Sequence, residues 1–210
     1  MARYTFAVVE AIFFWRNHKI PYRGTEIKKK WYKRFVAEWR VARTIRSGTG
    51  ENVRDLLNKR LLSVRNSTSP AELVEEVADA LQKEGYGAKG GRPISLVSKI
   101  AYFLRPKDLT PQDRFALRGL NCRRTENDLP RVRSGQYTDF VGAFNQEFSR
   151  VREEIVAECK QRWARALVTR LGLGPRLLNT TAFQRKVLDN MLMAEGGRWP
   201  RRGDSEDEAG

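Results

Sequence analysis

Residues 92–120, RPISLVSKIAYFLRPKDLTPQDRFALRGL, hold two apolar helical patterns with a proline-rich turn between them. The first pattern spans about 11 residues and ends at Pro106, because proline cannot continue a helix. Thr110, which another proline follows, is expected to begin the second helix. The segment therefore predicts two consecutive helices, the first carrying Lys99 and the second carrying Asp113.

The same helical spacing continues on both sides of this segment. An upstream stripe predicts a helix whose core-facing residues are Ile27, Trp31, Phe35, Trp39 and Ala42. A downstream stripe predicts the longest helix of the chain, with core-facing residues Phe140, Phe144, Phe148, Val151, Ile155, Cys159, Trp163 and Leu167. No stretch alternates apolar and polar residues as a half-buried strand does, so the sequence predicts an all-α protein.

Local signals place several boundaries. Ser69, Pro70 and an acidic residue three positions after the serine predict the start of a helix with a capping box, and Gly85 is expected to end it. Residues 121–136 have turn composition and predict a loop.

The length and composition predict a single globular multi-helix domain over residues 1–195 and a disordered tail over residues 196–210. The tail is basic at residues 198–202 (RWPRR) and acidic at residues 204–208 (DSEDE). Segregated charge without an apolar period is typical of disorder.

Several function classes are not expected. Cys122 and Cys159 lie in separate segments and His18 is the single histidine, which disfavours a zinc site. There is no glycine-rich phosphate-binding motif. The apolar run of residues 6–15 contains Glu10 and is too short to span a membrane. We therefore expect no metal, no cofactor and no membrane association, and two reduced thiols in a cytoplasmic protein.

The charge of the chain points to a polyanionic partner. Lys and Arg number 40 against 25 Asp and Glu, a net charge of +15, and residues 16–65 alone contribute +11 of it. Polyanions release counterions when they bind such a surface, so nucleic acid is the expected partner. The expected nucleic-acid-binding residues are Lys28, Lys29, Lys30, Tyr32, Lys33, Arg34, Arg40, Arg43 and Arg46.

Aromatic residues interleaved with these cations can stack on unpaired bases. Tyr32 is expected on the outer face of its helix for this role, and Trp199 is a second candidate. Trp31 and Trp39 follow the core stripe and are expected to pack inside. A solvated exterior, or a surface for an acidic protein, is the alternative interpretation of the basic face.

Lys99 and Asp113 form the candidate catalytic pair. A lysine amine in an apolar environment is more readily neutral and can attack an electrophilic carbon, such as the anomeric carbon of a deoxynucleotide. A nearby carboxylate can stabilise the cationic sugar as the base departs. The alternative is structural: Thr110 and Asp113 fit a capping box, and Lys99 lies on the polar side of its helix, where it would be solvated.

The pattern around this pair is Ser98-Lys99, then Phe103, Pro106 and Pro111-Gln112-Asp113. It resembles the helix-hairpin-helix DNA glycosylase superfamily, and more closely its 8-oxoguanine-glycosylase-like prokaryotic members. The resemblance implies that Lys99 is a nucleophile and that Asp113 is the carboxylate of the site. The glycine-rich hairpin of that family, whose backbone amides approach a DNA phosphate, is replaced here by residues 94–97 (ISLV).

We therefore expect a DNA-binding protein with a DNA N-glycosylase or AP-lyase-like site at Lys99 and Asp113, with DNA favoured over RNA. The alternative is a non-catalytic nucleic-acid-binding or assembly module, such as a phage or defence-system accessory subunit with a protein partner. A shared cleft for the amine and the carboxylate favours the enzyme, and separate faces favour the module. The sequence leaves the oligomeric state open.

Overall fold

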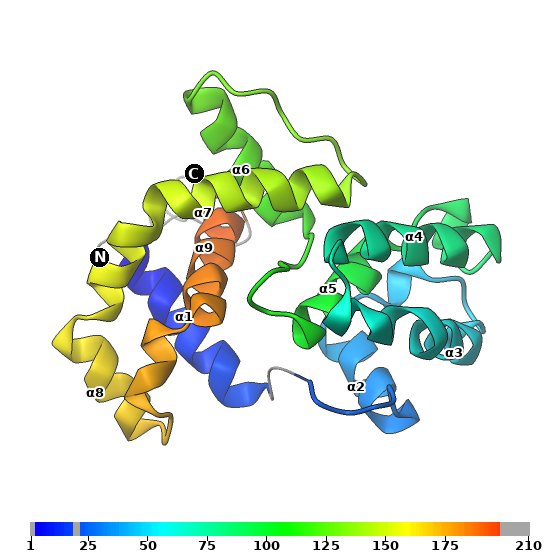
Figure 1. Cartoon of the computed structure of the whole chain (residues 1–210), viewed down its shortest axis with the longest axis horizontal. Coiled ribbons are helices and arrows are strands. Elements are labelled where there is room, and N and C mark those ends of the chain that lie inside the picture. Colours follow the sequence, from blue (N-terminus) through cyan, green and yellow to red (C-terminus); the bar gives the residue numbers. More distant parts are fainter. Residues whose placement is uncertain (1–2, 19–21, 198–210) are drawn as a thin grey trace, which may run out of the picture. The chain divides into compact units, whose positions relative to one another are not determined.

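The computed structural model describes residues 3–18 and 22–197 (Figure 1). Its α-helices are α1 (Arg3–Asn17), α2 (Lys29–Glu38), α3 (Gly50–Arg60), α4 (Pro70–Lys83), α5 (Ile94–Leu104), α6 (Arg114–Glu126), α7 (Tyr137–Cys159), α8 (Arg162–Arg170) and α9 (Thr181–Glu195). Short 3-10 helices are η1 (Ala42–Thr44), η2 (Leu61–Asn66), η3 (Ala88–Gly90) and η4 (Pro175–Asn179). Within the described residues the only β feature is an isolated bridge between Ile45 and Gly87. The predicted all-α fold is confirmed.

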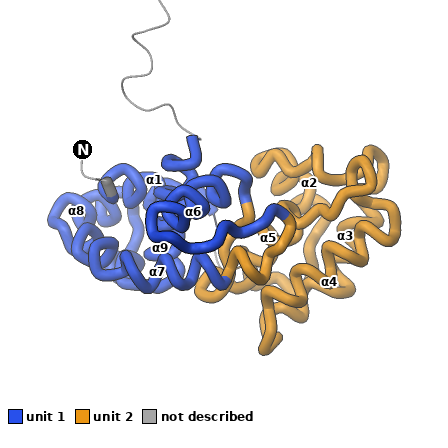
Figure 2. The backbone as a smooth tube through the Cα atoms, turned by 90° about the horizontal axis from the view of Figure 1, so that it is seen from above, with its two compact units in different colours: residues 1–18, 113–134, 142–210 blue, residues 19–112, 135–141 orange. Residues whose placement is uncertain are grey.

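Two compact units divide the described chain, and Figure 2 colours them separately. Of the described residues, unit 1 holds 3–18, 113–134 and 142–197, and unit 2 holds 22–112 and 135–141. The region predicted as one helical domain thus contains two units. Residues 198–210 of the predicted tail lie outside the described residues.

Helix α5 forms the core of unit 2. All side chains of residues 96–104 are buried, because α5 packs against both α4 and η2. The first turn of α7 also belongs to this unit, where the Tyr137 hydroxyl donates a hydrogen bond to the Thr110 carbonyl at 2.8 Å. The Thr138 backbone amide donates to the Glu75 carboxylate at 2.9 Å.

Helix α4 begins and ends as its local signals predict. Pro70 occupies the first turn, where its missing amide hydrogen costs nothing, and Gly85 follows the helix with a left-handed φ of 72°. The predicted capping box does not form, because the Ser69 side chain makes no cap hydrogen bond. The Ser69 backbone amide instead donates to the Ser67 hydroxyl at 3.1 Å.

Helix α2 is shorter than the apolar stripe predicts. It ends at Glu38, and Arg40 adopts a left-handed φ of 50°. The amide of Val41 then donates to the carbonyl of Val36, which is the bond that closes a Schellman motif. Val41 is fully buried, so the chain turns there to place this side chain in the core, and Ala42 is left exposed.

Helix α6 differs from the prediction at both ends. It begins at Arg114 rather than at Thr110, and Asp113 is its N-cap residue. It continues to Glu126, so the first six residues of the predicted loop are helical. The helix persists because its polar side chains have buried partners: the Asn121 carboxamide exchanges two hydrogen bonds with the backbone of Val132, at 2.9 and 2.8 Å.

The longest helix was predicted to be continuous, and this prediction is wrong because the segment forms two helices. The chain breaks between α7 and α8, where Gln161 has an extended ψ of 145°. An unbroken helix over residues 140–170 would be about 45 Å long. The break lets α8 fold back onto α1 and η4, so that Ala164 and Val168 are buried.

Helix α9 is the centre of unit 1, where it packs against both α1 and α6 (Figure 1). Every side chain of residues 182–193 is buried, including charged ones. Lys186 lies 2.5 Å from Asp189 and 4.6 Å from the centroid of the Phe14 ring. A buried ammonium is tolerated here because a carboxylate and an aromatic face replace water.

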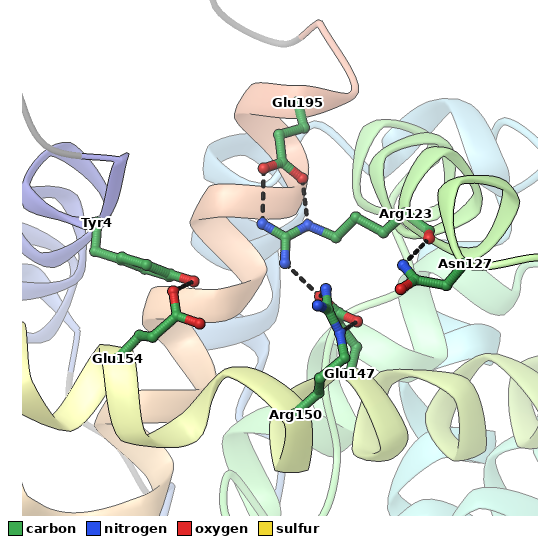
Figure 3. A network of polar contacts seen from close by, with 7 residues as sticks. All are labelled: Tyr4, Arg123, Asn127, Glu147, Arg150, Glu154 and Glu195. Atoms are coloured by element: carbon green, nitrogen blue, oxygen red, sulfur yellow. Dashed lines mark hydrogen bonds and ion pairs between the residues drawn. The ribbon is translucent and has the colours of Figure 1, made fainter.

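Arg123 joins three helices of unit 1 in a network of ion pairs that Figure 3 shows. Its guanidinium makes two hydrogen bonds to Glu195, at 2.6 and 2.7 Å, and a third to Glu147. Arg150 also binds Glu147, at 2.8 Å. Burial disfavours the charged guanidinium, but the bonds to Glu195 and Glu147 outweigh it and raise the pKa of Arg123 above its ordinary value.

We expect the network to make unit 1 sensitive to acid. Burial opposes ionisation of Glu147, but hydrogen bonds from Arg150 and Arg123 outweigh it and hold the pKa of Glu147 below its ordinary 4.5. The carboxylate then stabilises the folded state fully above pH 4.5, and this contribution is lost as the pH falls through the folded-state pKa. Urea unfolding of wild type and Glu147→Gln should therefore converge between about pH 5 and pH 3.

Glu153 provides the control for this titration, because it is exposed on the same helix. Glu153→Gln should keep the steep wild-type loss of stability in acid. Parallel pH profiles for wild type and Glu147→Gln would contradict the expectation.

Candidate functional site

The predicted nucleic-acid-binding cations gather around α2 in unit 2. We call them the α2 basic surface, and all are exposed: Lys28, Lys29, Lys30, Lys33, Arg34, Arg40, Arg43 and Arg46. The four on α2 itself are spaced at residues 29, 30, 33 and 34, which is one face of a helix. The opposite face holds the buried Tyr32 and Phe35. The predicted exposure of these cations is confirmed.

Among the described residues, acidic partners neutralise only two of these eight cations. Lys29 pairs with Glu51 of α3, and Arg34 pairs with Glu38 at 2.5 Å. The hydrogen bond from Lys29 also lowers the pKa of the Glu51 carboxyl. The remaining six cations form no ion pair within the described residues, so they are available to phosphate groups.

The prediction that Tyr32 lies on the outer face of α2 and stacks on a base is wrong. Only 5% of its surface is exposed, so it cannot stack on a base from the outer face of α2. Burial raises its pKa to about 12, against the opposing charge of Arg54. The prediction failed because the Tyr32 ring lies beside Gly50 of α3, a contact that helical spacing within α2 does not reveal. Trp199, the other base-stacking candidate, lies outside the described residues.

We expect Tyr32→Phe to stabilise the protein by about 1 kcal/mol. The buried Tyr32 hydroxyl has no hydrogen-bond partner in the described part of the chain, so its removal deletes a desolvated polar group at little packing cost. Urea unfolding measures the gain, and nucleic-acid affinity should not change. A loss of affinity would show that the hydroxyl contacts the ligand.

An aromatic cluster connects α2 to α5. Trp31, Phe35 and Trp39 stack along α2 with ring centroids 4.9 and 5.6 Å apart. The Phe103 ring of α5 meets all three edge-on, at 6.0, 5.5 and 5.3 Å. Offset and edge-on rings are favourable geometries, so the cluster holds the two helices in fixed register. Trp31 and Trp39 are half-buried, so the prediction that both pack inside is confirmed only in part.

Lys99 lies at the end of this cluster. Its amine is 5.8 Å from the centroid of the Trp39 ring, and only 7% of the residue is exposed. The alternative interpretation, in which Lys99 is solvated, is therefore wrong. The polar neighbours that suggested it, Ser98 and Tyr102, are themselves buried. A signal for this burial was present, since eight of the eleven residues of α5 are hydrophobic and a helix that is apolar all round is a buried one.

Asp113 lies in unit 1 and caps α6. Its Oδ1 accepts a hydrogen bond from the Phe115 amide at 3.0 Å. The predicted capping role is thus confirmed in kind, although Asp113 is the N-cap residue itself and not the third residue after a Thr110 cap. Lys99 belongs to unit 2, so the pairing of its amine with the Asp113 carboxylate stays a prediction.

Gln112 is a feature that the sequence did not single out. Its backbone amide donates to the Ser98 hydroxyl at 3.1 Å, which ties the turn before α6 to the residue next to Lys99. Its carboxamide is buried, and neither polar atom has a hydrogen-bond partner in the described structure. Such a group retains its capacity to donate to and accept from a ligand.

Comparison with family models, curated proteins and solved structures finds no match. No three His, Cys, Asp or Glu side chains among the described residues are grouped so as to hold a metal ion. Over the same residues, no helix has the length and apolar character needed to cross a membrane.

Proposed function

We propose that the protein binds DNA through the α2 basic surface and that Lys99 is the nucleophile of a glycosylase or lyase-type reaction on a damaged or abasic nucleotide. The observation that carries the proposal is the buried Lys99 amine beside Trp39. Trp39 is the C-cap residue of α2, the helix that presents the exposed cations. Phosphates held by those cations would bring a nucleotide toward the amine.

The chemistry requires an amine in its neutral form. Burial disfavours an ammonium ion and favours the neutral, nucleophilic amine. The Lys99 amine would attack C1′ of the nucleotide, the bond from C1′ to the base would break, and the base would leave with the electron pair. The sugar ring would then open as its oxygen takes a proton from the amine, which leaves an iminium between Nζ and C1′. At an abasic site the amine would add to the C1′ aldehyde and the aldehyde oxygen would leave as water, which gives the same iminium. Asp113 is the proposed carboxylate that stabilises the cationic sugar.

Gln112 supports a role in recognising the base. An extruded base is read through hydrogen bonds to its edge, and a carboxamide offers both a donor and an acceptor. Residue 112 is tied by its backbone to Ser98, the neighbour of Lys99.

Borohydride trapping tests the proposal. Hydride reduces the iminium to a stable amine, so incubation with abasic or oxidised-base DNA should leave a covalent protein–DNA adduct that peptide mapping assigns to Lys99. Lys99→Ala and Lys99→Arg should lose the adduct, because neither retains a primary amine on that helix. Lys83→Ala, which removes an exposed lysine of the same unit, should keep it.

The same experiment separates the two functions. No adduct across a panel of lesions, or an adduct that persists in Lys99→Ala, would reject the nucleophile. DNA binding without an adduct would favour a non-catalytic nucleic-acid-binding or assembly module, in which Asp113 only caps α6. Competition by unlabelled RNA of matched length tests the preference for DNA.

A further inference from the structure

Unit 1 carries a second concentration of positive charge that the α2 basic surface does not include. Residues 160–188 contain seven Lys and Arg and no Asp or Glu. Two of the seven, Arg185 and Lys186, are buried in α9. The other five are exposed, and we call them the α8 basic surface: Lys160, Arg162, Arg165, Arg170 and Arg176.

No carboxylate of the described residues pairs with these five side chains. None of them forms an ion pair or a side-chain hydrogen bond within residues 3–18 and 22–197. The nearest carboxylates along the chain are bound elsewhere: Glu154 accepts from the Tyr4 hydroxyl at 2.6 Å, and Glu158 accepts from the Thr5 hydroxyl at 2.7 Å (Figure 3 shows the first). Both contacts direct these two carboxylates toward α1.

The structure of α8 leaves only its charged face for a partner. Ala164 and Val168 are buried where α8 packs on α1 and η4, whereas Arg162 and Arg165 lie one turn apart on the outer face. A helix that binds a membrane surface needs its apolar face for the lipid, and here the protein buries Ala164 and Val168 of that face and half-buries Trp163 and Leu167. The charged side chains on the exposed surface of α8 are all cations: Arg162, Arg165 and Arg170.

The residue types indicate a phosphate ligand. Four of the five cations are arginine, whose planar guanidinium matches two oxygens of one phosphate group, as a lysine ammonium does not. Arg162 and Arg170 are eight residues apart, about 12 Å along the helix, and a duplex carries one charge per 1.7 Å of its axis. The row therefore spans several phosphates.

We infer that the α8 basic surface is a second binding surface for the nucleic-acid backbone, so that each unit of the protein has its own phosphate contacts. It shares only the class of ligand with the proposed function and does not depend on Lys99. An acidic protein is the competing partner for such a surface, and the experiment distinguishes the two.

The test compares matched triple variants of the full chain in fluorescence anisotropy with a labelled duplex of about 30 base pairs, measured over a range of salt concentrations. The first removes Arg162, Arg165 and Arg170 as alanine substitutions. The second removes Lys30, Lys33 and Arg43 of the α2 basic surface in the same way. The control has equal loss of charge in unit 1 but outside α8, through Arg131→Ala, Arg133→Ala and Arg152→Ala, all exposed.

The α8 variant should bind at least about tenfold more weakly at 0.1 M salt, with a log–log salt slope shallower by about 2.7, or 0.9 per lost contact. The control should stay within about twofold of wild type. The charge-conserving variant Arg162→Lys, Arg165→Lys, Arg170→Lys should keep most of the slope but lose affinity, because it lacks the bidentate geometry. Circular dichroism and unfolding midpoints should show that all variants fold.

An unchanged slope in the α8 variant, or an equal change in the control, would overturn the inference. So would an α8 variant that binds DNA normally but no longer binds polyglutamate, since that result assigns the surface to an acidic protein. A weakened α8 variant with an unaffected α2 variant would support this surface while rejecting the α2 basic surface of the proposed function. The reverse pattern would reject this surface alone.

Discussion

Replacing Arg123 with methionine is expected to lower the free energy of unfolding by about 3–5 kcal/mol. The guanidinium is 2% exposed and holds Glu195 and Glu147, so its removal leaves two carboxylates without their shared counter-charge. Methionine fills a similar volume, and the loss therefore reports the charge and not a cavity. Urea unfolding monitored by circular dichroism measures it.

Arg150 is the matched control, since it binds the same Glu147 carboxylate from an exposed position. Arg150→Met should cost at most about 1 kcal/mol, because water screens and replaces an exposed ion pair. Equal losses for the two substitutions would show that burial of Arg123 contributes nothing beyond the ion pair itself.

Gly119→Ala is expected to destabilise unit 1 by about 3 kcal/mol. Helices α6 and α9 approach so closely that a Cβ at residue 119 would lie 2.0 Å from the Leu192 carbonyl oxygen and 2.8 Å from its carbonyl carbon. Backbone atoms of a buried helix cannot rotate away as a side chain can, so the two helices would have to separate. A second contact of this kind lies at the C-terminal end of α9, where a Cβ on Gly196 would lie 2.0 Å from the Phe115 carbonyl oxygen.

Gly142→Ala tests the same substitution without the contact. Gly142 is an exposed residue of α7 with no atom within 4 Å of where its Cβ would lie. Alanine should stabilise this helix by about 0.5–1 kcal/mol, because glycine loses more backbone entropy on folding. The midpoints of thermal and urea unfolding should therefore fall for Gly119→Ala and rise for Gly142→Ala. A stabilising Gly119→Ala would mean that α6 and α9 do not pack at this distance.

Local signals in the sequence were sufficient where a boundary depends on the residues beside it. Pro70 and Gly85 bracket α4 because each acts through its own backbone conformation. The exposure of the α2 cations followed from their number, since a helix core cannot hold that many unpaired charges.

Local signals failed where a distant residue decides the outcome. The predicted loop at residue 121 is helix because Arg123 finds Glu195, which is 72 residues away along the chain. The exposure predicted for Tyr32, and the solvated position that the alternative interpretation gave Lys99, failed for a related reason. The spacing within one helix says which side chains share a face, but not which faces the neighbouring helices cover.

The sequence by itself determined that this protein is all-α, where most of its helices lie and that α2 is lined with exposed positive charge. The tertiary structure alone decided that the Lys99 amine lies beside Trp39, that α6 and α9 meet at Gly119, and that the exposed cations of α8 form no ion pair within the described residues. Helix formation depends on neighbours three and four residues away, and net charge is a sum over residues. Burial depends on contacts between segments far apart in the chain, which a one-dimensional pattern does not specify.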